Sequence, residues 1–279
     1  MKRIGLYPNA KRDSGLQGTR EVIRTLRDCG VSFYAPLAFS EALAEEKKVH
    51  FVSEEALFRE SECLVTLGGD GTILSVARRA AEQDLPIFGI NLGHVGFMAA
   101  LEKNQIGRVR ALADGDFFES SRMLLDCAVN GKRTLSALNE LVIAPERGFH
   151  IVELSLLAGE KKLCDFRADG LIFNTHTGST GYAFSAGGAV MDAEYDAIGV
   201  KAISSYLLVN AHHMIFRPET VFTALGCRSE DSAVTVCADG RETSVIGEGD
   251  VVTISRSPHR VRLYTLEPRS NQEVFFRKF

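Results

Sequence analysis

The first hundred residues alternate short apolar runs with segments of helical periodicity, and this alternation restricts the possible folds more than any other feature. Strands are predicted at residues 3–7, 31–34, 63–67 and 86–90. Helices are predicted between them, at residues 53–60, at 72–82, and from a capping box of Ser14 and Gln17 to a stop at Gly30. This strand–helix order predicts a parallel sheet covered by helices.

The pattern changes after about residue 120, where strands follow one another without helices. Residues 123–129 and 132–137 flank Asn130-Gly131, which predicts a hairpin with a type I′ turn. Further strands are predicted at residues 151–158, 221–225, 233–238, 251–255 and 261–266. The second half is therefore predicted to be all-β, as a sandwich or folded-over sheet.

These two patterns divide the chain into an α/β domain over residues 1–110 and a β-rich domain over residues 111–262. The end of the chain, about residues 263–279, carries Val274, Phe275, Phe276 and Phe279 and is too apolar for a free terminus. We expect this tail to pack back on the first domain.

Charge and cysteine usage exclude several classes of protein. The formal net charge of −4 and the lack of a basic run argue against binding to nucleic acid or to a membrane by charge. No apolar run is long enough to span a bilayer and no secretory segment opens the chain, so a cytoplasmic protein is expected. The six cysteines lie far apart and predict reduced, mostly buried thiols rather than disulfides or a metal site.

The glycine loop, Gly68-Gly69-Asp70-Gly71-Thr72, is the most informative motif because it joins a predicted buried strand to a predicted helix. Glycines let backbone N–H groups approach phosphate oxygens, and a helix start adds partial positive charge. The alternative is a tight turn in which Asp70 caps the helix. The usual P-loop and dinucleotide fingerprints are absent from the sequence.

A second segment, residues 169–188, concentrates hydroxyls, glycines and the aromatic residues Tyr182 and Phe184. Such a composition suits a polar ligand with a base that stacks on a ring, although an ordinary surface loop is an equally good interpretation. Gly178-Ser179-Thr180-Gly181 differs in spacing from a nucleophile elbow, so a serine hydrolase is disfavoured.

Two dipeptides are candidate ligand sites. Asn139-Glu140 interrupts apolar sequence at a strand edge, where an amide and a carboxylate can hold the two hydroxyls of a ribose, although a plain turn is also possible. His212-His213 is a poor metal site, because adjacent residues of a strand point to opposite faces.

Taken together, the glycine loop, residues 89–97, Asn139-Glu140, Asp169-Gly170 and residues 177–182 resemble the NAD kinase family in order and spacing. The resemblance implies an N-terminal Rossmann-like α/β domain and a C-terminal β-sandwich-like domain. It also implies transfer of the ATP γ-phosphate to the 2′-hydroxyl of the adenosine ribose of NAD, which produces NADP.

The resemblance assigns a role to each matching residue. Asp70 is similar to the general base, and Gly68, Gly69, Gly71 and Thr72 to the loop on the phosphate side. Contacts to NAD are implied for Asp70, Gly71, Asn139, Glu140, His150, Arg167, Asp169, Thr180, Gly181, Tyr182, Ala183, Phe184, Ser185, Ala202 and Arg241. Tyr182 is the implied stacking ring.

The chain also departs from the family pattern. His176 stands where proline is usual, Gly181 where alanine is usual, and Arg241 where glutamine is common. These departures affect the expected substrate preference and leave the glycine loop intact.

Phosphoryl transfer requires alignment of the nucleophile and neutralisation of charge, and Asp70 is the one acid within the glycine loop. Mg²⁺ or another divalent cation is expected to arrive with ATP, without a protein cage. A homodimer or homotetramer is implied by the resemblance. A lipid kinase of the diacylglycerol or sphingoid type and a non-catalytic dinucleotide sensor are the alternatives. The use of polyphosphate as donor, the choice between NAD and NADH, and feedback regulation stay open.

Overall fold

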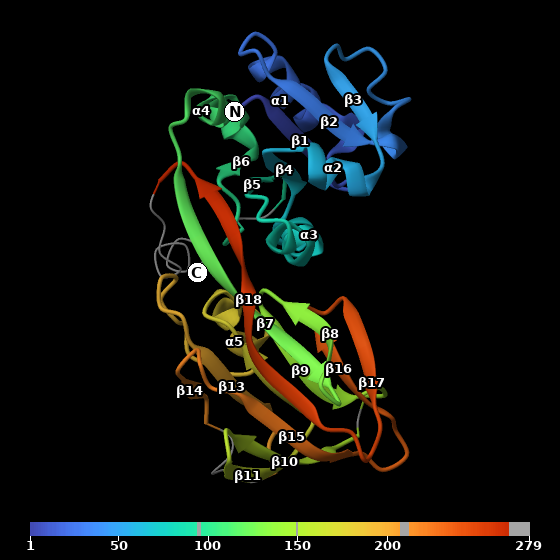
Figure 1. Ribbon diagram of the computed structural model, residues 1–279, viewed down its shortest axis with the longest axis vertical. Coiled ribbons are helices and arrows are strands. Elements are labelled where there is room, and N and C mark those ends of the chain that lie inside the picture. Colours follow the sequence, from blue (N-terminus) through green and yellow to red (C-terminus); the bar gives the residue numbers. More distant parts are fainter. Residues whose placement is uncertain (94–95, 149, 207–211, 268–279) are drawn as a thin grey trace. The chain divides into compact units, whose positions relative to one another are not determined.

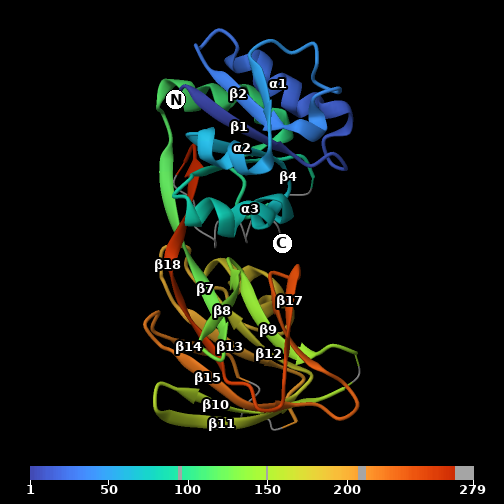
Figure 2. The same ribbon diagram turned by 45° about the vertical axis from the view of Figure 1, so that its right-hand side comes forward.

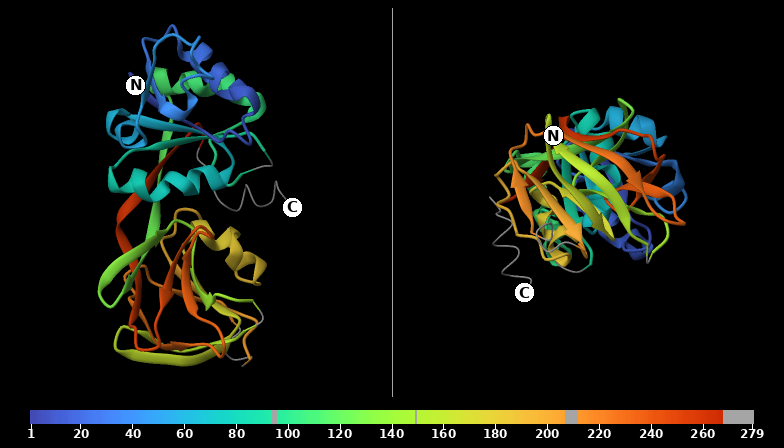
Figure 3. Two further views of the ribbon diagram at one scale, coloured as in Figure 1. Left: turned by 90° about the vertical axis from the view of Figure 1, so that its right-hand side faces the viewer. Right: turned by 90° about the horizontal axis from the view of Figure 1, so that it is seen from below.

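The computed structural model describes residues 1–93, 96–148, 150–206 and 212–267 (Figure 1). The chain forms two compact units: unit 1 contains residues 1–122 and the stretch that begins at His259, and unit 2 contains Met123–Pro258. The chain passes from one unit to the other within two long strands, β7 (Phe118–Val129) and β18 (Val252–Thr265), drawn in green and red in Figure 3. The sequence pattern predicts this change near residues 110 and 262.

Unit 1 is an α/β fold, as predicted. Its parallel strands lie in the order β3-β2-β1-β4-β5, and β6 and the end of β18 both pair with β5. The strands are β1 (Arg3–Pro8), β2 (Ser32–Pro36), β3 (Val49–Val52), β4 (Cys63–Gly68), β5 (Ile87–Asn91) and β6 (Leu101–Glu102). The helices are α1 (Gln17–Leu26), α2 (Glu54–Glu60), α3 (Asp70–Glu82) and α4 (Ala111–Asp114), with short 3₁₀ segments at Ser14–Leu16, Leu37–Phe39 and Lys103–Arg110.

Two local expectations in unit 1 were wrong, and one strand was not predicted. The capping box at Ser14 does not form, because the Asp13 carboxylate accepts the N–H groups of Gly18 and Thr19 at 2.8 and 3.0 Å. A carboxylate is a stronger acceptor for these amides than a hydroxyl. Helix α1 ends at Leu26 and a turn carries the chain to Gly30, whose φ is 72°. Strand β3 was missed, since its four residues are mostly half-buried and give no clear apolar run.

Unit 2 consists of two antiparallel sheets, which confirms the β-sandwich-like fold. One sheet has the order β14-β13-β12-β9-β16-β17 and the other β11-β10-β15-β18-β7-β8. The strands not yet given are β8 (Lys132–Ala137), β9 (Glu140–Pro145), β10 (Val152–Ala158), β11 (Lys161–Ala168), β12 (Gly170–Asn174), β13 (Ile198–Ile203), β14 (Met214–Phe216), β15 (Phe222–Arg228), β16 (Val234–Ala238) and β17 (Glu242–Ile246). Strands β10, β11 and β15 lie side by side at the bottom of Figure 2.

The core of unit 2 lies between these sheets. Phe173 on β12 and Phe222 on β15 are fully buried, with ring centroids 5.5 Å apart, so aromatic packing joins one sheet to the other. The predicted hairpin is confirmed: Asn130 and Gly131 have φ values of 51° and 77°, as a type I′ turn requires.

The strands expected at residues 251–255 and 261–266 are parts of the single strand β18. Its alternation of buried and exposed residues shifts near Pro258, where the chain leaves unit 2, and the sequence pattern therefore suggested a break. Residues 268–279, with most of the tail expected to pack on unit 1, lie outside the described residues. None of the described helices is long and apolar enough to cross a membrane.

The cysteines are free thiols, and Cys63, Cys127 and Cys227 are buried while Cys29, Cys164 and Cys237 are half-buried. Burial raises the pKa of the Cys127 and Cys227 thiols to about 11. These thiols are therefore packing groups rather than nucleophiles.

Candidate active site

The glycine loop, residues Gly68–Thr72, joins the end of β4 to the start of α3 in unit 1. Gly69 has an extended backbone, with φ −131° and ψ −172°, and Asp70 is the first residue of the helix. A Cβ on Gly68 would lie 2.1 Å from the Thr72 hydroxyl oxygen, so this position has room for glycine alone. The Thr72 N–H donates to the Gly69 carbonyl at 2.8 Å, which closes the turn.

The Asp70 carboxylate is held by a different segment of the chain. It accepts the N–H groups of Phe97 and Met98 at 2.8 and 3.2 Å. A Cβ on Gly96 would lie 2.6 Å from one Asp70 oxygen, which explains the last glycine of the 89–97 motif. Asp70 is thus oriented by backbone amides of the neighbouring segment rather than serving as a helix cap.

Gly71 lies in the first turn of α3 and is exposed. Among the described residues nothing lies within 4 Å of the position that its Cβ would occupy. Glycine in a helix costs about 1 kcal/mol relative to alanine, and the packing within this chain does not require it here. The space at the Cβ position of Gly71 is therefore open, as a close ligand such as a phosphate group would need.

In unit 2, residues 138–140 form a turn into β9 that we call the acid corner. The N–H groups of Leu138, Asn139 and Glu140 all donate to the Asp239 carboxylate, at 2.9, 2.8 and 3.1 Å. Asp239 follows β16 and has a φ of 50°. Glu140 pairs with Asn174, the last residue of β12, so the acid corner lies at that end of the sheet.

The Glu140 carboxyl group is buried and has one oxygen without a hydrogen-bond partner among the described residues. Glu140 is 8% exposed, and that oxygen is Oε2. Burial, and secondly the charge of Asp239, raise the pKa of Glu140 to about 7, while the Tyr182 N–H lowers it. The Asn139 Oδ1 atom is also buried without a partner within the described ranges. These two unpartnered oxygens, on neighbouring residues, each lack a hydrogen-bond donor, and ligand hydroxyls could supply the donors.

The hydroxyl-rich segment packs directly against the acid corner. It forms a 3₁₀ turn at Thr177–Thr180 and the short helix α5 (Tyr182–Ser185), with Gly178 and Ser179 buried, so it is not a solvated loop. A Cβ added to Gly178 would lie 2.0 Å from the Asn139 carbonyl oxygen, and a Cβ added to Gly181 would lie 3.0 Å from Glu140 Oε2.

The side chains of this segment separate into structural and exposed groups. Ser179 donates to the His176 carbonyl and accepts the Met191 N–H, so its hydroxyl holds the fold. This bonding supports the rejection of a serine hydrolase. The Tyr182 side chain is 45% exposed and free to stack, whereas Ala183 is fully buried. Thr180, Phe184 and Ser185 lie in the same two turns.

Arg241 joins this group from the β16–β17 turn, where its N–H donates to the Ala238 carbonyl at 2.9 Å. Burial raises the pKa of Asp239, while the three N–H groups that it accepts and then the charge of Arg241 lower it. The acid corner, residues 180–185 and Arg241 thus come together at one end of the six-stranded sheet, as members of one ligand site would.

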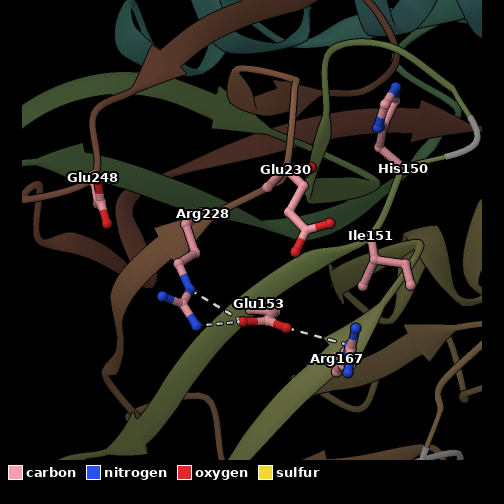
Figure 4. Close-up of a pocket in the computed structure, with 8 residues that line it drawn as sticks. His150, Ile151, Glu153, Arg167, Arg228, Glu230 and Glu248 are labelled. Atoms are coloured by element: carbon pink, nitrogen blue, oxygen red, sulfur yellow. Dashed lines mark hydrogen bonds and ion pairs between the residues drawn. The ribbon is translucent and has the colours of Figure 1, made fainter.

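Four other predicted residues lie elsewhere in unit 2. Asp169 and Ala202 are at the opposite end of β12 from Glu140: the Asp169 N–H donates to the Ile203 carbonyl, and Ala202 pairs with Leu171. His150 and Arg167 line a separate cavity of about 420 Å³ (Figure 4).

In this cavity Glu153 lies between two arginines. It accepts from Arg228 at 2.7 Å and pairs with Arg167 at 3.2 Å (Figure 4). Within one chain the residues that line this cavity do not include those of the acid corner.

Two residues beside the site were not predicted as members of it. Asp239 stands before Gly240, and an Asp-Gly pair indicates a turn without revealing what its carboxylate binds. His213 precedes β14 instead of lying in a strand, so the strand argument against a metal site does not apply. Its ring accepts the Ala189 N–H at 2.9 Å and lies 3.1 Å from the Asn174 amide oxygen. Among the described residues, no group of three His, Cys, Asp or Glu side chains could hold a metal ion.

Comparison with known proteins finds two family models that match along this chain. The family model described as the ATP-NAD kinase N-terminal domain matches residues 4–114, and the ATP-NAD kinase C-terminal domain matches residues 138–266. The NAD kinase of Natranaerobius thermophilus is 31% identical and the alignment covers 100% of this chain and 98% of that protein. The NAD kinase of Gemmatimonas aurantiaca is 32% identical over 90% of this chain and 88% of its own.

Two solved structures have a similar fold. Yeast NADH kinase complexed with NADH aligns with a TM-score of 0.86 and 19% identity, over 100% of this chain and 86% of that one. An NAD kinase from Archaeoglobus fulgidus in complex with ATP aligns with a TM-score of 0.73 and 23% identity, over 100% of this chain and 98% of that one.

The fold and the matched domains define a two-domain phosphotransferase. The chain belongs to the NAD kinase family. The relatives reported above are named NAD kinases and not lipid kinases.

Proposed function

We propose that this protein transfers the γ-phosphate of ATP to the 2′-hydroxyl of the adenosine ribose of NAD and thereby produces NADP. The observation that carries the proposal is the acid corner, where Glu140 Oε2 and Asn139 Oδ1 are buried without partners beside the exposed Tyr182 ring. A ribose offers hydroxyl donors, and the attached adenine offers a face for stacking. The names of the matched relatives, NAD kinases and an NADH kinase, support this substrate class.

In this proposal the acid corner orients the ribose and Tyr182 stacks on the base. Glu140 must be ionised to accept from hydroxyls with both oxygens, and a hydroxyl donor at Oε2 favours that ionised form. Residues Thr180, Gly181, Ala183, Phe184 and Ser185 shape the wall of the site, and Arg241 supplies positive charge at its edge.

We assign Asp70 the role of general base. The 2′-oxygen forms a bond to the γ-phosphorus, the bond to the β-phosphate oxygen breaks, and the hydroxyl proton passes to Asp70. Phe97 and Met98 hold the carboxylate in a fixed direction, which suits proton transfer because acceptor and donor must be aligned. Gly68, Gly69, Gly71 and Thr72 form the loop on the phosphate side.

Mg²⁺, or another divalent cation, is proposed to enter as part of the nucleotide substrate. The described residues offer no cluster of three acidic or histidine ligands, so they suit a cation carried by phosphate oxygens better than a resident ion. When bound with ATP the cation neutralises charge on the phosphate oxygens.

The separate location of four predicted residues supports a homodimer or homotetramer. His150, Arg167, Asp169 and Ala202 do not reach the acid corner within one chain. We propose that they contact NAD bound by a second copy. A cytoplasmic location is proposed with this assembly, and free thiols suit that compartment.

Incubation of the pure protein with ATP, Mg²⁺ and NAD tests the function, with NADP detected by an NADP-specific dehydrogenase. We expect NADP to accumulate, and to require both nucleotide and cation. Parallel reactions with polyphosphate as donor, with NADH, and with a diacylglycerol or sphingoid acceptor measure the range of substrates. Binding of NAD without NADP formation under any donor would indicate a non-catalytic sensor.

A further inference from the structure

We propose that Asp239 is a positioning residue for the ribose site: its carboxylate fixes the backbone at residues 138–140, so that the Asn139 and Glu140 side chains present their unpartnered oxygens to the ligand. This inference rests on the proposed function of the acid corner. Asp239 contacts that corner from the turn directly after β16, a hundred residues further along the chain.

The contacts of Asp239 are too many for an ordinary turn residue. Its two oxygens accept three successive backbone N–H groups, those of Leu138, Asn139 and Glu140. Its own N–H donates to the Glu140 carbonyl at 3.0 Å, so the two backbones are joined in both directions. Three consecutive amides that point at one carboxylate leave little freedom to the peptide planes that carry Asn139 and Glu140.

The same carboxylate also acts on the charge of Glu140. Two acids close together disfavour ionisation of each other, and the charge of Asp239 is the second cause, after burial, of the raised pKa of Glu140. The other titratable groups facing the pair are Arg241 and Cys237. The charge of Arg241 lowers the pKa of Asp239. Burial raises the pKa of the Cys237 thiol, and the charges of both carboxylates raise it further. Tyr182 faces Glu140 through its backbone N–H.

A purely structural role for Asp239 predicts different results from a positioning role. A residue that only stabilises the β16–β17 turn would affect melting temperature and the fraction of active protein. A residue that positions the ribose site would affect the KM for NAD and the acidic limb of its pH profile, while kcat for bound substrate would change little.

Asp239→Asn in the full-length protein is the main test. Asparagine tolerates the φ of 50° at this position, but its amide nitrogen cannot accept an N–H group. We expect the KM for NAD to rise about 10-fold or more, as for the loss of a hydrogen bond to a charged group, with kcat within about 3-fold of wild type. The acidic limb of kcat/KM for NAD should move to lower pH, because Glu140 loses a neighbouring negative charge.

Asp250→Asn is the matched control. Asp250 likewise accepts a backbone N–H, from Gly247 at 2.7 Å, and an amide of Asn130, in a turn beyond the opposite end of β17. We expect this variant to lose some stability while the KM for NAD and the pH profile stay at wild-type values.

A lowered melting temperature with unchanged KM and pH profile in Asp239→Asn would overturn the proposal, as would equal effects in the control. Should Asp239→Asn fail to fold, Asp239→Gly keeps the allowed φ and removes the acceptor entirely, and the same KM and pH criteria apply. Failure of both variants to fold would also overturn it, because Asp239 would then serve the stability of unit 2. An inactive wild type would instead refute the proposed function.

Discussion

The glycine loop and the acid corner each place a carboxylate beside a glycine-rich helical turn, but they prepare it in opposite ways. Both oxygens of Asp70 accept backbone N–H groups, from Phe97 and Met98. Glu140 has one buried oxygen without a partner among the described residues, and its pKa is raised to about 7. Asp70 is therefore held in a fixed orientation, whereas Glu140 has a vacant acceptor that a ligand can fill.

The two regions also make room for a ligand differently. In the glycine loop the space comes from a missing side chain, since a Cβ on Gly71 would meet no described atom. In the acid corner the backbone is crowded, and a Cβ on Gly178 would lie 2.0 Å from the Asn139 carbonyl oxygen. The first arrangement suits a phosphate chain that approaches backbone amides, and the second suits a ribose bound by side chains.

The largest effect is expected at Asp70. Asp70→Asn should lower kcat by about 10² to 10⁴, because the amide cannot accept the 2′-hydroxyl proton. The affinity for NAD measured by calorimetry should change little. Asp114→Asn, an exposed acid of unit 1, is the control and should retain full activity. More than about a tenth of wild-type kcat in Asp70→Asn would contradict the catalytic assignment.

The next largest effect concerns Tyr182. Tyr182→Ala should weaken NAD binding by about 1 to 3 kcal/mol through lost stacking, an estimate taken from aromatic contacts with nucleic-acid bases. Because this side chain is 45% exposed, thermal stability should stay close to wild type. Tyr195→Ala, at 63% exposure, provides the comparison and should bind NAD normally. Equal NAD affinity in both variants would mean that the base of NAD does not stack on Tyr182.

Glu140 makes stability and binding depend on pH in opposite directions. Because its folded pKa of about 7 lies above the ordinary 4.5, the folded state holds the proton more tightly. The stabilisation is fully present below pH 4.5 and is lost as pH rises through about 7, by on the order of 3 kcal/mol. NAD affinity should rise over the same range, since hydroxyls need the ionised acceptor.

Glu140→Gln should remove both dependences. Urea unfolding at pH 5 and pH 8 should show the variant gaining stability relative to wild type at the higher pH. Calorimetry should show weaker NAD binding that no longer changes with pH. A wild type whose stability is the same at both pH values would contradict the assignment of a raised pKa to this residue.

The smallest effect is expected at Gly71. Gly71→Ala should stabilise α3 by about 0.5 to 1 kcal/mol, because alanine has the higher helix propensity and meets no atom. The same methyl group should obstruct the phosphate oxygens and raise the KM for ATP. Gly107→Ala, also at an open position of a helical segment, serves as the control with unchanged kinetics. An unchanged KM for ATP in Gly71→Ala would show that the glycine loop does not approach the nucleotide closely.

The sequence alone determined the features that are encoded by short-range pattern. Alternating strands and helices predicted unit 1, period-2 strands predicted unit 2, and Asn130-Gly131 predicted the hairpin that forms. The glycine loop was readable because only a residue without a Cβ fits at Gly68. The family motifs are also visible in the sequence, since each is a local run of residues.

The tertiary structure alone decided which distant residues meet. Asp70 lies against Phe97 and Met98 because β4 and β5 are neighbours in the sheet. Asp239 reaches the acid corner because β16 pairs with β9. Neither pairing follows from local periodicity, which fixes the face of a strand but not its neighbour. The pKa of Glu140 depends on such a pairing, because burial and the charge of Asp239 exist only once the strands have assembled.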